Sequence, residues 1–277
     1  MKTQTMSNNS FTLKNGLTIA YYDSAPDKQL PVVVLLHGYC GSSSYFQELT
    51  PLLGRSCRVI TPDLIGHGAS ASYEQDTYAL QEQAQFMIEW LDGIAVSSAV
   101  MLGHSLGGYI TLAVAEQKPS FLSAFGLLHS TALPDSEQAK QNREQAIRTV
   151  QEQGVQSFVD GLVPKLIAAD HPQRAALIEI ASAIGYSTTA AAVSGYARGM
   201  KERPDRTLVI EETSLPVLLI SGAKDAIVSS ENTFAGRNAS TECHIIAEAG
   251  HMGMLEAPQQ LAAIIEKFIS TKGETID

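Results

Sequence analysis

The sequence predicts an α/β protein: a mostly parallel sheet of eight strands with an N-terminal hairpin, helices on both faces and a helical cap inserted after the sixth strand. First, short apolar, β-branched runs alternate with segments of helical apolar spacing, as expected for a parallel sheet covered on both faces. Second, helical segments rich in Gln, Ala and Arg interrupt this alternation over 134–212. We therefore predict a core of residues 1–133 and 213–277, with the cap at 134–212 over the carboxyl ends of the strands, where ligands bind in such sheets.

The elements follow in order along the chain. A hairpin is predicted over 11–23, and its Asn15-Gly16 dipeptide suits a type I′ turn. Continuous apolar runs, which are typical of strands buried on both faces, predict strands at 31–38, 57–64, 98–104, 121–130, 215–225 and 242–251. Apolar residues three and four positions apart predict core helices at 44–54, 77–93, 106–117, 231–236 and 258–269.

Charge and cysteine content exclude several classes of protein. The 277 residues include 19 Lys and Arg against 29 Asp and Glu, a net charge of −10. Because an acidic chain repels nucleic-acid phosphates and anionic lipids, we expect neither nucleic acid nor membrane as a partner. Cys40, Cys57 and Cys243 are too few and too scattered for a disulfide framework or a zinc site. We expect all three in or near the core.

The sequence lacks the usual signals for a membrane span, a secretory leader or a cofactor. No apolar run approaches about 18 residues, and the first residues contain no apolar stretch of the kind found in a signal peptide. We therefore expect a cytoplasmic protein. No histidine and carboxylate spacing is typical of a metal site, and no glycine-rich phosphate loop is present. We accordingly expect no metal and no cofactor.

One short motif indicates chemistry. Gly103-His104-Ser105-Leu106-Gly107 follows a predicted buried strand and precedes a predicted helix. That arrangement is typical of a nucleophile elbow, in which a sharp turn lifts the serine hydroxyl above the sheet and flanking glycines let strand and helix approach closely. The amides that begin the following helix favour negative charge at the site. Ser105 is therefore the predicted nucleophile.

A serine nucleophile needs an adjacent base, and the base needs an acid that orients it. His251 follows the last predicted strand, and Asp225 ends the strand at 215–225. The chain order Ser105, Asp225, His251 is the order that accompanies a nucleophile elbow. Three other carboxylates were candidates for the acid, but none ends a strand after the cap: Asp160, Asp170 and Glu248.

These motifs together resemble the α/β-hydrolases of the single-domain esterase type, over nearly the whole chain outside the cap. The matching segments are HGYCGSS at 37–43, DLIGHGAS at 63–70, GHSLGGYITLAVAEQKP at 103–119, SGAKDAIV at 221–228 and AGHMGMLEAP at 249–258. The resemblance implies the α/β-hydrolase fold and an oxyanion hole formed by the backbone N–H groups of Tyr39 and Leu106. It argues against haloalkane dehalogenases and epoxide hydrolases of this fold, which carry aspartate where this chain has Ser105.

A second set of residues is expected around the reacting groups. The candidate residues of the substrate pocket are His129, Phe158, Leu162 and Met252. Apolar cap residues of this kind pack on the core more often than they contact substrate, and in a cap they can do both. The remaining histidines of the quoted motifs are expected to hold loops through hydrogen bonds: His37, His67 and His104.

The sequence thus favours a serine hydrolase, monomeric or homodimeric, that cleaves carboxylic esters of short to medium acyl chain through an acyl-enzyme. Several alternatives use the same scaffold: a C–C bond hydrolase, a lactonase, a perhydrolase, or the pyruvate-eliminating lyase of menaquinone synthesis. The lyase would need an arginine-rich pocket, and the cap contains Arg143, Arg148, Arg174, Arg198, Arg203 and Arg206. A further alternative is a small-molecule receptor or signalling protein with little turnover.

Overall fold

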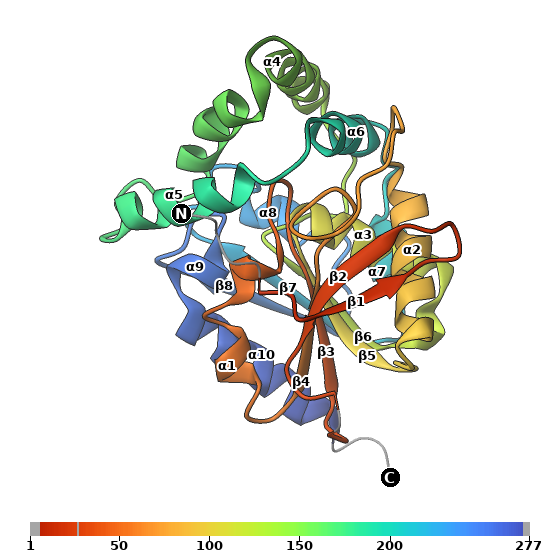
Figure 1. Ribbon diagram of the computed structural model, residues 1–277. Coiled ribbons are helices and arrows are strands. Elements are labelled where there is room, and N and C mark those ends of the chain that lie inside the picture. Colours follow the sequence, from red (N-terminus) through yellow and green to blue (C-terminus); the bar gives the residue numbers. More distant parts are fainter. Residues whose placement is uncertain (1–5, 27, 274–277) are drawn as a thin grey trace.

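A computed structural model describes residues 6–26 and 28–273, and its described part contains one sheet of eight strands in the order β1-β2-β4-β3-β5-β6-β7-β8 (Figure 1). The strands are β1 Asn9–Thr12, β2 Thr18–Asp23, β3 Val32–Leu36, β4 Arg58–Pro62, β5 Ala99–His104, β6 Leu122–Leu128, β7 Val217–Gly222 and β8 Thr241–Ile246. The two contacts made by β2 are antiparallel, and all other strand pairs are parallel. The predicted fold class is confirmed.

The N-terminal hairpin is present, but the predicted turn type is wrong. A type I′ turn needs positive φ at both central residues, whereas in this loop only Gly16 has a positive φ, of 86°. Leu13 N–H instead donates to Leu17 O at 2.8 Å, and Gly16 N–H donates to Leu13 O at 2.9 Å. Leu13 is buried, so the strands separate one residue earlier and a longer loop joins them.

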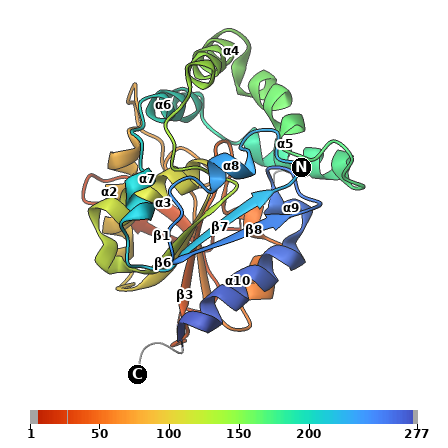
Figure 2. The same ribbon diagram turned by 180° about the vertical axis from the view of Figure 1, so that it is seen from behind.

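Helices cover both faces of the sheet (Figures 1 and 2). On one face, α2 (Leu80–Gly93) and α3 (Leu106–Gln117) pack with α7 (Thr207–Glu211), around buried residues such as Trp90. On the other, α1 (Thr50–Leu53) and α10 (Pro258–Gly273) pack around residues such as Phe268. Each large apolar side chain so buried contributes about 1.5–3 kcal/mol, and the two apolar layers fix where the strands end.

Between β6 and β7 the chain forms the helices of the cap: α4 (Glu137–Leu162), α5 (Arg174–Gly185) and α6 (Ala190–Lys201). They lie above one end of the sheet (Figure 1), and α4 bends at Gly154, whose φ is 84°. The segment predicted as cap also includes α7, whose Ile210 packs in the same cluster as α3 of the core. The boundaries at 134 and 212 stay predictions, and the predicted ends of the core, residues 1–5 and 274–277, lie outside the described residues.

The short elements complete the chain. The α-helices are α8 (Ser230–Thr233) and α9 (Gly253–Glu256), and the 3-10 turns are Ser43–Phe46, Pro119–Phe121 and Val163–Lys165. Within residues 6–26 and 28–273, no single helix is long and apolar enough to cross a membrane; α5 and α6 meet the length and composition criteria only as a pair bent by 101°. Cys40 and Cys57 are buried, but Cys243 is exposed. The expected core position is therefore wrong for Cys243, which lies on the edge strand β8.

Candidate active site

Ser105 occupies the sharp turn between β5 and α3, with φ 49° and ψ −115°. A non-glycine residue in such a conformation costs about 1–3 kcal/mol and is found mainly at functional sites. The flanking positions have no room for a side chain, so only glycine fits there. A Cβ at Gly103 would lie 2.2 Å from Gly107 O, and a Cβ at Gly107 would lie 2.3 Å from Leu36 O. The motif is therefore an elbow whose glycines let α3 approach the ends of β3 and β5.

Backbone hydrogen bonds hold Ser105 in this strained conformation. Its N–H donates to Leu128 O at 3.1 Å, and its carbonyl accepts from Gly108 N–H at 2.9 Å. The carbonyl also accepts from the hydroxyl of the buried Ser130 at 2.7 Å. Sequence reasoning did not assign this role to Ser130, because a serine after a strand has no pattern that distinguishes it from any loop serine.

Asp225 and His251 form a buried pair. His251 Nδ1 donates to Asp225 Oδ2 at 2.8 Å, while Asp225 Oδ1 accepts the N–H groups of Ile227 at 2.8 Å and Val228 at 3.0 Å. Burial alone would raise the pKa of Asp225, but the attraction of His251 and these hydrogen bonds outweigh it and lower that pKa. The carboxylate is thus charged and fixes the imidazole so that Nε2 faces away from it.

The other acid candidates do not meet His251. Asp160 bonds to the Tyr186 hydroxyl, and Asp170 and Glu248 both accept from Lys224 Nζ, at 2.9 and 2.8 Å. No hydrogen bond joins the described residues Ser105 and His251 in this structure. Such bonds often tighten only when substrate binds.

A buried glutamate that sequence reasoning missed holds the loop that carries His251. Glu256 Oε2 accepts the N–H groups of Gly250 and Met252, both at 2.9 Å, and Oε1 accepts from Ala168 N–H at 2.7 Å. His251 N–H donates to Leu166 O at 2.8 Å. A glutamate two residues before a proline-led helix is not a signal in sequence, since most glutamates are solvated.

Two further histidines pack around His251. The Nε2–H of His104 donates to the carbonyl oxygen of His251 at 2.9 Å, and their rings lie 5.0 Å apart. His129 has a φ of 49° and is fully buried. Its Nδ1 lies 3.6 Å from Asp225 Oδ2, beyond hydrogen-bonding distance, and neither ring nitrogen meets a partner among the described residues. His129 thus contacts the acid; its pocket role stays a prediction.

The predicted oxyanion donors face no internal acceptor. Neither Tyr39 N–H nor Leu106 N–H donates a hydrogen bond to another described residue, and Leu106 begins α3, where the first amides of a helix are unpaired. Cys40 adopts a φ of 55°, and its N–H donates to His67 Nε2 at 3.2 Å. This contact fixes the loop after Tyr39.

Neutral buried histidines brace that loop, as the sequence predicted for His37 and His67. Leu64 N–H donates to His37 Nε2 at 2.9 Å, so Nδ1 carries the proton and donates to Gly38 O at 2.8 Å. Burial lowers the pKa of His67 well below 6.5 and also lowers that of His37. Uncharged imidazoles with one donor and one acceptor nitrogen suit this role.

The remaining predicted pocket residues are divided between cap and core. Phe158 of α4 meets the Tyr39 ring edge-on at 5.7 Å, and Tyr39 Oη donates to Val193 O of α6 at 2.6 Å. Leu162 is half-buried in the apolar cluster under the cap, and Met252 is fully buried in the same cluster. The structure therefore joins Tyr39 to Phe158. Contact of any of these residues with substrate stays a prediction.

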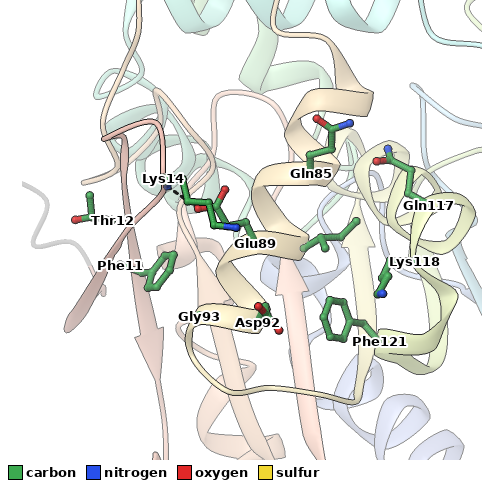
Figure 3. Close-up of a pocket in the computed structure, with 11 residues that line it drawn as sticks. Phe11, Thr12, Lys14, Gln85, Glu89, Asp92, Gly93, Gln117, Lys118 and Phe121 are labelled. Carbon is green, nitrogen blue, oxygen red and sulfur yellow. Dashed lines mark hydrogen bonds between the residues drawn. The ribbon is translucent and has the colours of Figure 1, made fainter.

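A separate surface hollow lies away from these residues. It has a volume of about 580 Å³ and lies between β1, α2 and the end of α3 that is opposite Ser105 (Figure 3). Its charged lining mixes both signs, Lys14 and Lys118 with Glu89 and Asp92. In the described part of the chain, no three His, Cys, Asp or Glu side chains are grouped closely enough to hold a metal ion.

Comparisons with known proteins agree with this architecture. The profile of the alpha/beta hydrolase family matches residues 33–264. The chain therefore belongs to that family of hydrolases. A thermophilic esterase from Thermogutta terrifontis, solved with malate bound, superposes with a TM-score of 0.87 at 26% identity, covering 96% of this chain and 99% of that one.

Two curated relatives extend the comparison. One is the dihydrolipoyllysine-residue acetyltransferase component of the acetoin cleaving system of Pseudomonas putida, 30% identical over 89% of this chain and 65% of the relative; the chain thus spans about two thirds of that relative's length. The other is a putative 2-succinyl-6-hydroxy-2,4-cyclohexadiene-1-carboxylate synthase of Bacillus subtilis, 26% identical over 95% of this chain and 98% of the relative.

Proposed function

We propose that this chain is a serine hydrolase that cleaves carboxylic esters of short to medium acyl chain through an acyl-enzyme intermediate. The observation that carries the proposal is the buried His251–Asp225 hydrogen bond of 2.8 Å at the same sheet edge as the strained elbow residue Ser105. A neutral imidazole held in one tautomer by a carboxylate is the base that a serine hydroxyl needs.

In the proposed mechanism, Ser105 Oγ attacks the ester carbonyl while His251 Nε2 takes its proton. Asp225 stabilises the imidazolium that forms, and the N–H groups of Tyr39 and Leu106 bind the negative oxygen of the tetrahedral intermediate. Each such donor typically contributes about 10²–10³ in turnover. His251 then protonates the departing alcohol. A water molecule that His251 deprotonates attacks the acyl-enzyme carbonyl, and collapse of the second tetrahedral intermediate releases the acid and restores Ser105.

The test is hydrolysis of p-nitrophenyl acetate, butyrate, octanoate and palmitate by the wild type and by Ser105→Ala. We expect turnover of the shorter esters that falls by about 10⁴-fold or more in the variant. The matched control is Ser130→Ala, which keeps the Ser105 hydroxyl and should retain measurable activity. Activity that survives in Ser105→Ala overturns the nucleophile assignment, and a preference for palmitate overturns the proposed acyl length.

A second candidate is the synthase reaction named for the Bacillus subtilis relative, because that relative aligns over 98% of its length. It predicts negligible turnover of all four p-nitrophenyl esters, together with formation of 2-succinyl-6-hydroxy-2,4-cyclohexadiene-1-carboxylate from its pyruvate-bearing precursor and release of one pyruvate for each product. Ester turnover without that product decides for the esterase.

A further inference from the structure

Two arginines of the cap share one buried carboxylate next to residues that flank the candidate nucleophile. Asp135 precedes α4 and is nearly inaccessible; its Oδ2 accepts from Arg143 Nε at 3.1 Å and its Oδ1 from Arg203 Nη1 at 2.5 Å. Two guanidinium groups against one carboxylate leave an excess positive charge. Unpaired charge at a protein interior is costly, so the second arginine calls for an explanation.

The two arginines are not equivalent. Arg203 makes several contacts: besides Asp135 it donates to Leu133 O at 3.1 Å and Met200 O at 3.0 Å, and its Cζ lies 3.9 Å from the centroid of the Tyr109 ring. Arg143 makes one hydrogen bond, through Nε. Neither Nη group of Arg143 meets a partner among the described residues, and 24% of its side chain is accessible. Arg203 therefore serves the structure, and Arg143 has both Nη groups, with four N–H donors, to spare.

Contacts through Asp135 connect Arg143 to the candidate site. Burial lowers the pKa of Arg143, but Asp135 outweighs this and raises it, with further contributions from Tyr109 and Tyr39 close by. Asp135 also binds Arg203, whose guanidinium lies over the Tyr109 ring. Tyr39 carries a predicted oxyanion N–H, and Tyr109 lies one helical turn after Ser105 and donates its N–H to Ser105 O at 3.4 Å. The neighbouring carboxylate Glu144 is already paired with Lys201 Nζ at 2.6 Å, so it does not neutralise Arg143.

We infer that Arg143 is a specificity residue that binds a carboxylate carried by the substrate, so that the preferred substrates are half-esters of short dicarboxylic acids. The inference rests on the proposed ester hydrolysis. The planar guanidinium offers parallel N–H donors that match the two oxygens of a carboxylate. An ester whose acyl chain ends in a carboxylate places that group away from the reacting carbonyl, toward the cap.

The experiment compares two esters that differ only in one terminal group, monoethyl glutarate and ethyl valerate, by the rate of ethanol release. The measured quantity is the ratio of kcat/KM for the charged ester to that for the neutral one. In Arg143→Gln this ratio should fall about 10- to 100-fold, as expected for loss of a hydrogen-bonded ion pair. Arg143→Lys should lose less, because it keeps the charge without the fork.

Arg148→Gln is the matched control, since Arg148 lies on the same helix, is exposed and donates a hydrogen bond to Gln145. Its ratio should equal that of the wild type. The inference is overturned if the ratio in Arg143→Gln stays within about twofold of the wild type, or if Arg148→Gln lowers it equally. Partial unfolding of Arg143→Gln would lower both rates together and leave the ratio unchanged, so the ratio reports specificity and not stability.

A binding measurement keeps the inference testable if the wild type hydrolyses neither ester, the outcome that defeats the proposed function. Glutarate is titrated calorimetrically into Ser105→Ala and into the double variant Ser105→Ala, Arg143→Gln. Affinity that is about tenfold or more weaker in the double variant supports a carboxylate site at Arg143. Equal affinity, or no binding to either, overturns it.

Discussion

The strand ends of the core and the cap above them hold their polar groups in opposite ways. At the strand ends, buried polar side chains bond backbone of a different segment, as His104 does to His251 and Ser130 does to Ser105. The cap contains ion pairs near water, such as Lys201 with Glu144, and in its Arg143–Asp135 pair the arginine keeps unused donors. The difference is consistent with the proposed division of roles, in which the core carries out the chemistry and the cap selects the substrate.

The largest expected effect concerns the buried acid at the strand ends of the core. In Asp225→Asn the side chain keeps its size but can no longer stabilise an imidazolium or hold the same tautomer of His251, so kcat should fall by about 10⁴-fold. The control from the cap is Asp160→Asn. The Asp160 carboxylate accepts a hydrogen bond from the Tyr186 hydroxyl, and the kcat of this variant should match that of the wild type. Comparable losses in both variants would remove the special role of Asp225.

The next effect contrasts one glycine from each region. Gly107→Ala places a Cβ against the backbone oxygen of Leu36, which cannot move without shifting β3, and should lower the free energy of unfolding by about 1–3 kcal/mol. In Gly161→Ala of α4 the new Cβ meets nothing within 4 Å, and the variant should gain up to about 1 kcal/mol from helix propensity. Urea denaturation of both measures the difference; a stable Gly107→Ala protein would contradict the elbow packing.

A third variant sharpens the role of the buried carboxylate beneath the His251 loop. Glu256→Gln replaces one acceptor oxygen by an amide donor that faces backbone N–H groups, and unfolding should become easier by about 1–3 kcal/mol. We expect a fall in kcat that exceeds the change in KM, because His251 loses its fixed position. The control is Glu248→Gln, in the same loop region but exposed. If both variants behave like the wild type, Glu256 does not position the loop.

The smallest effect per residue concerns pH. Burial lowers the pKa of His67 and His104 well below 6.5, and also lowers that of His129. Below about pH 6.5 these histidines take up protons in the unfolded chain but stay neutral in the folded chain. The free energy of unfolding therefore falls as the pH drops, by up to about 1.4 kcal/mol per pH unit for each histidine. Above that pH these groups add no slope. Urea midpoints at about pH 5.5, 6.5 and 7.5 test this; a flat profile below 6.5 contradicts it.

Much of the core was predictable because its signals are local and periodic. The alternation of buried strands and helices gave the sheet, and the glycine spacing around Ser105 gave the elbow, since both depend on residues adjacent in sequence. The predicted hairpin turn was wrong because of tertiary packing. Leu13 is buried in the core, so Asn15-Gly16 does not form the two-residue turn that the dipeptide favours. The prediction that Cys243 lies in the core was wrong because the edge strand β8 exposes one face.

The supporting residues of the site could not be predicted, for a different reason. Glu256, Ser130 and Asp135 act by accepting or donating hydrogen bonds across long separations in sequence, such as Ala168 to Glu256. Their residue types are ordinary on a protein surface, so only the fold shows that they are buried. Likewise, six cap arginines look alike in sequence, and the structure separates Arg143 from Arg203 by the number of their partners.

The contacts of Glu256 also constrain how the cap can move. The carboxylate binds the loop of His251 and, through Ala168, the segment between α4 and α5, while His251 N–H binds Leu166 of that segment. A cap that lifted as one body would pull the base out of register with the acid. If the cap bends to admit a substrate, we expect the bend elsewhere, at Gly154, which has a positive φ and open space around it and divides α4 into two halves.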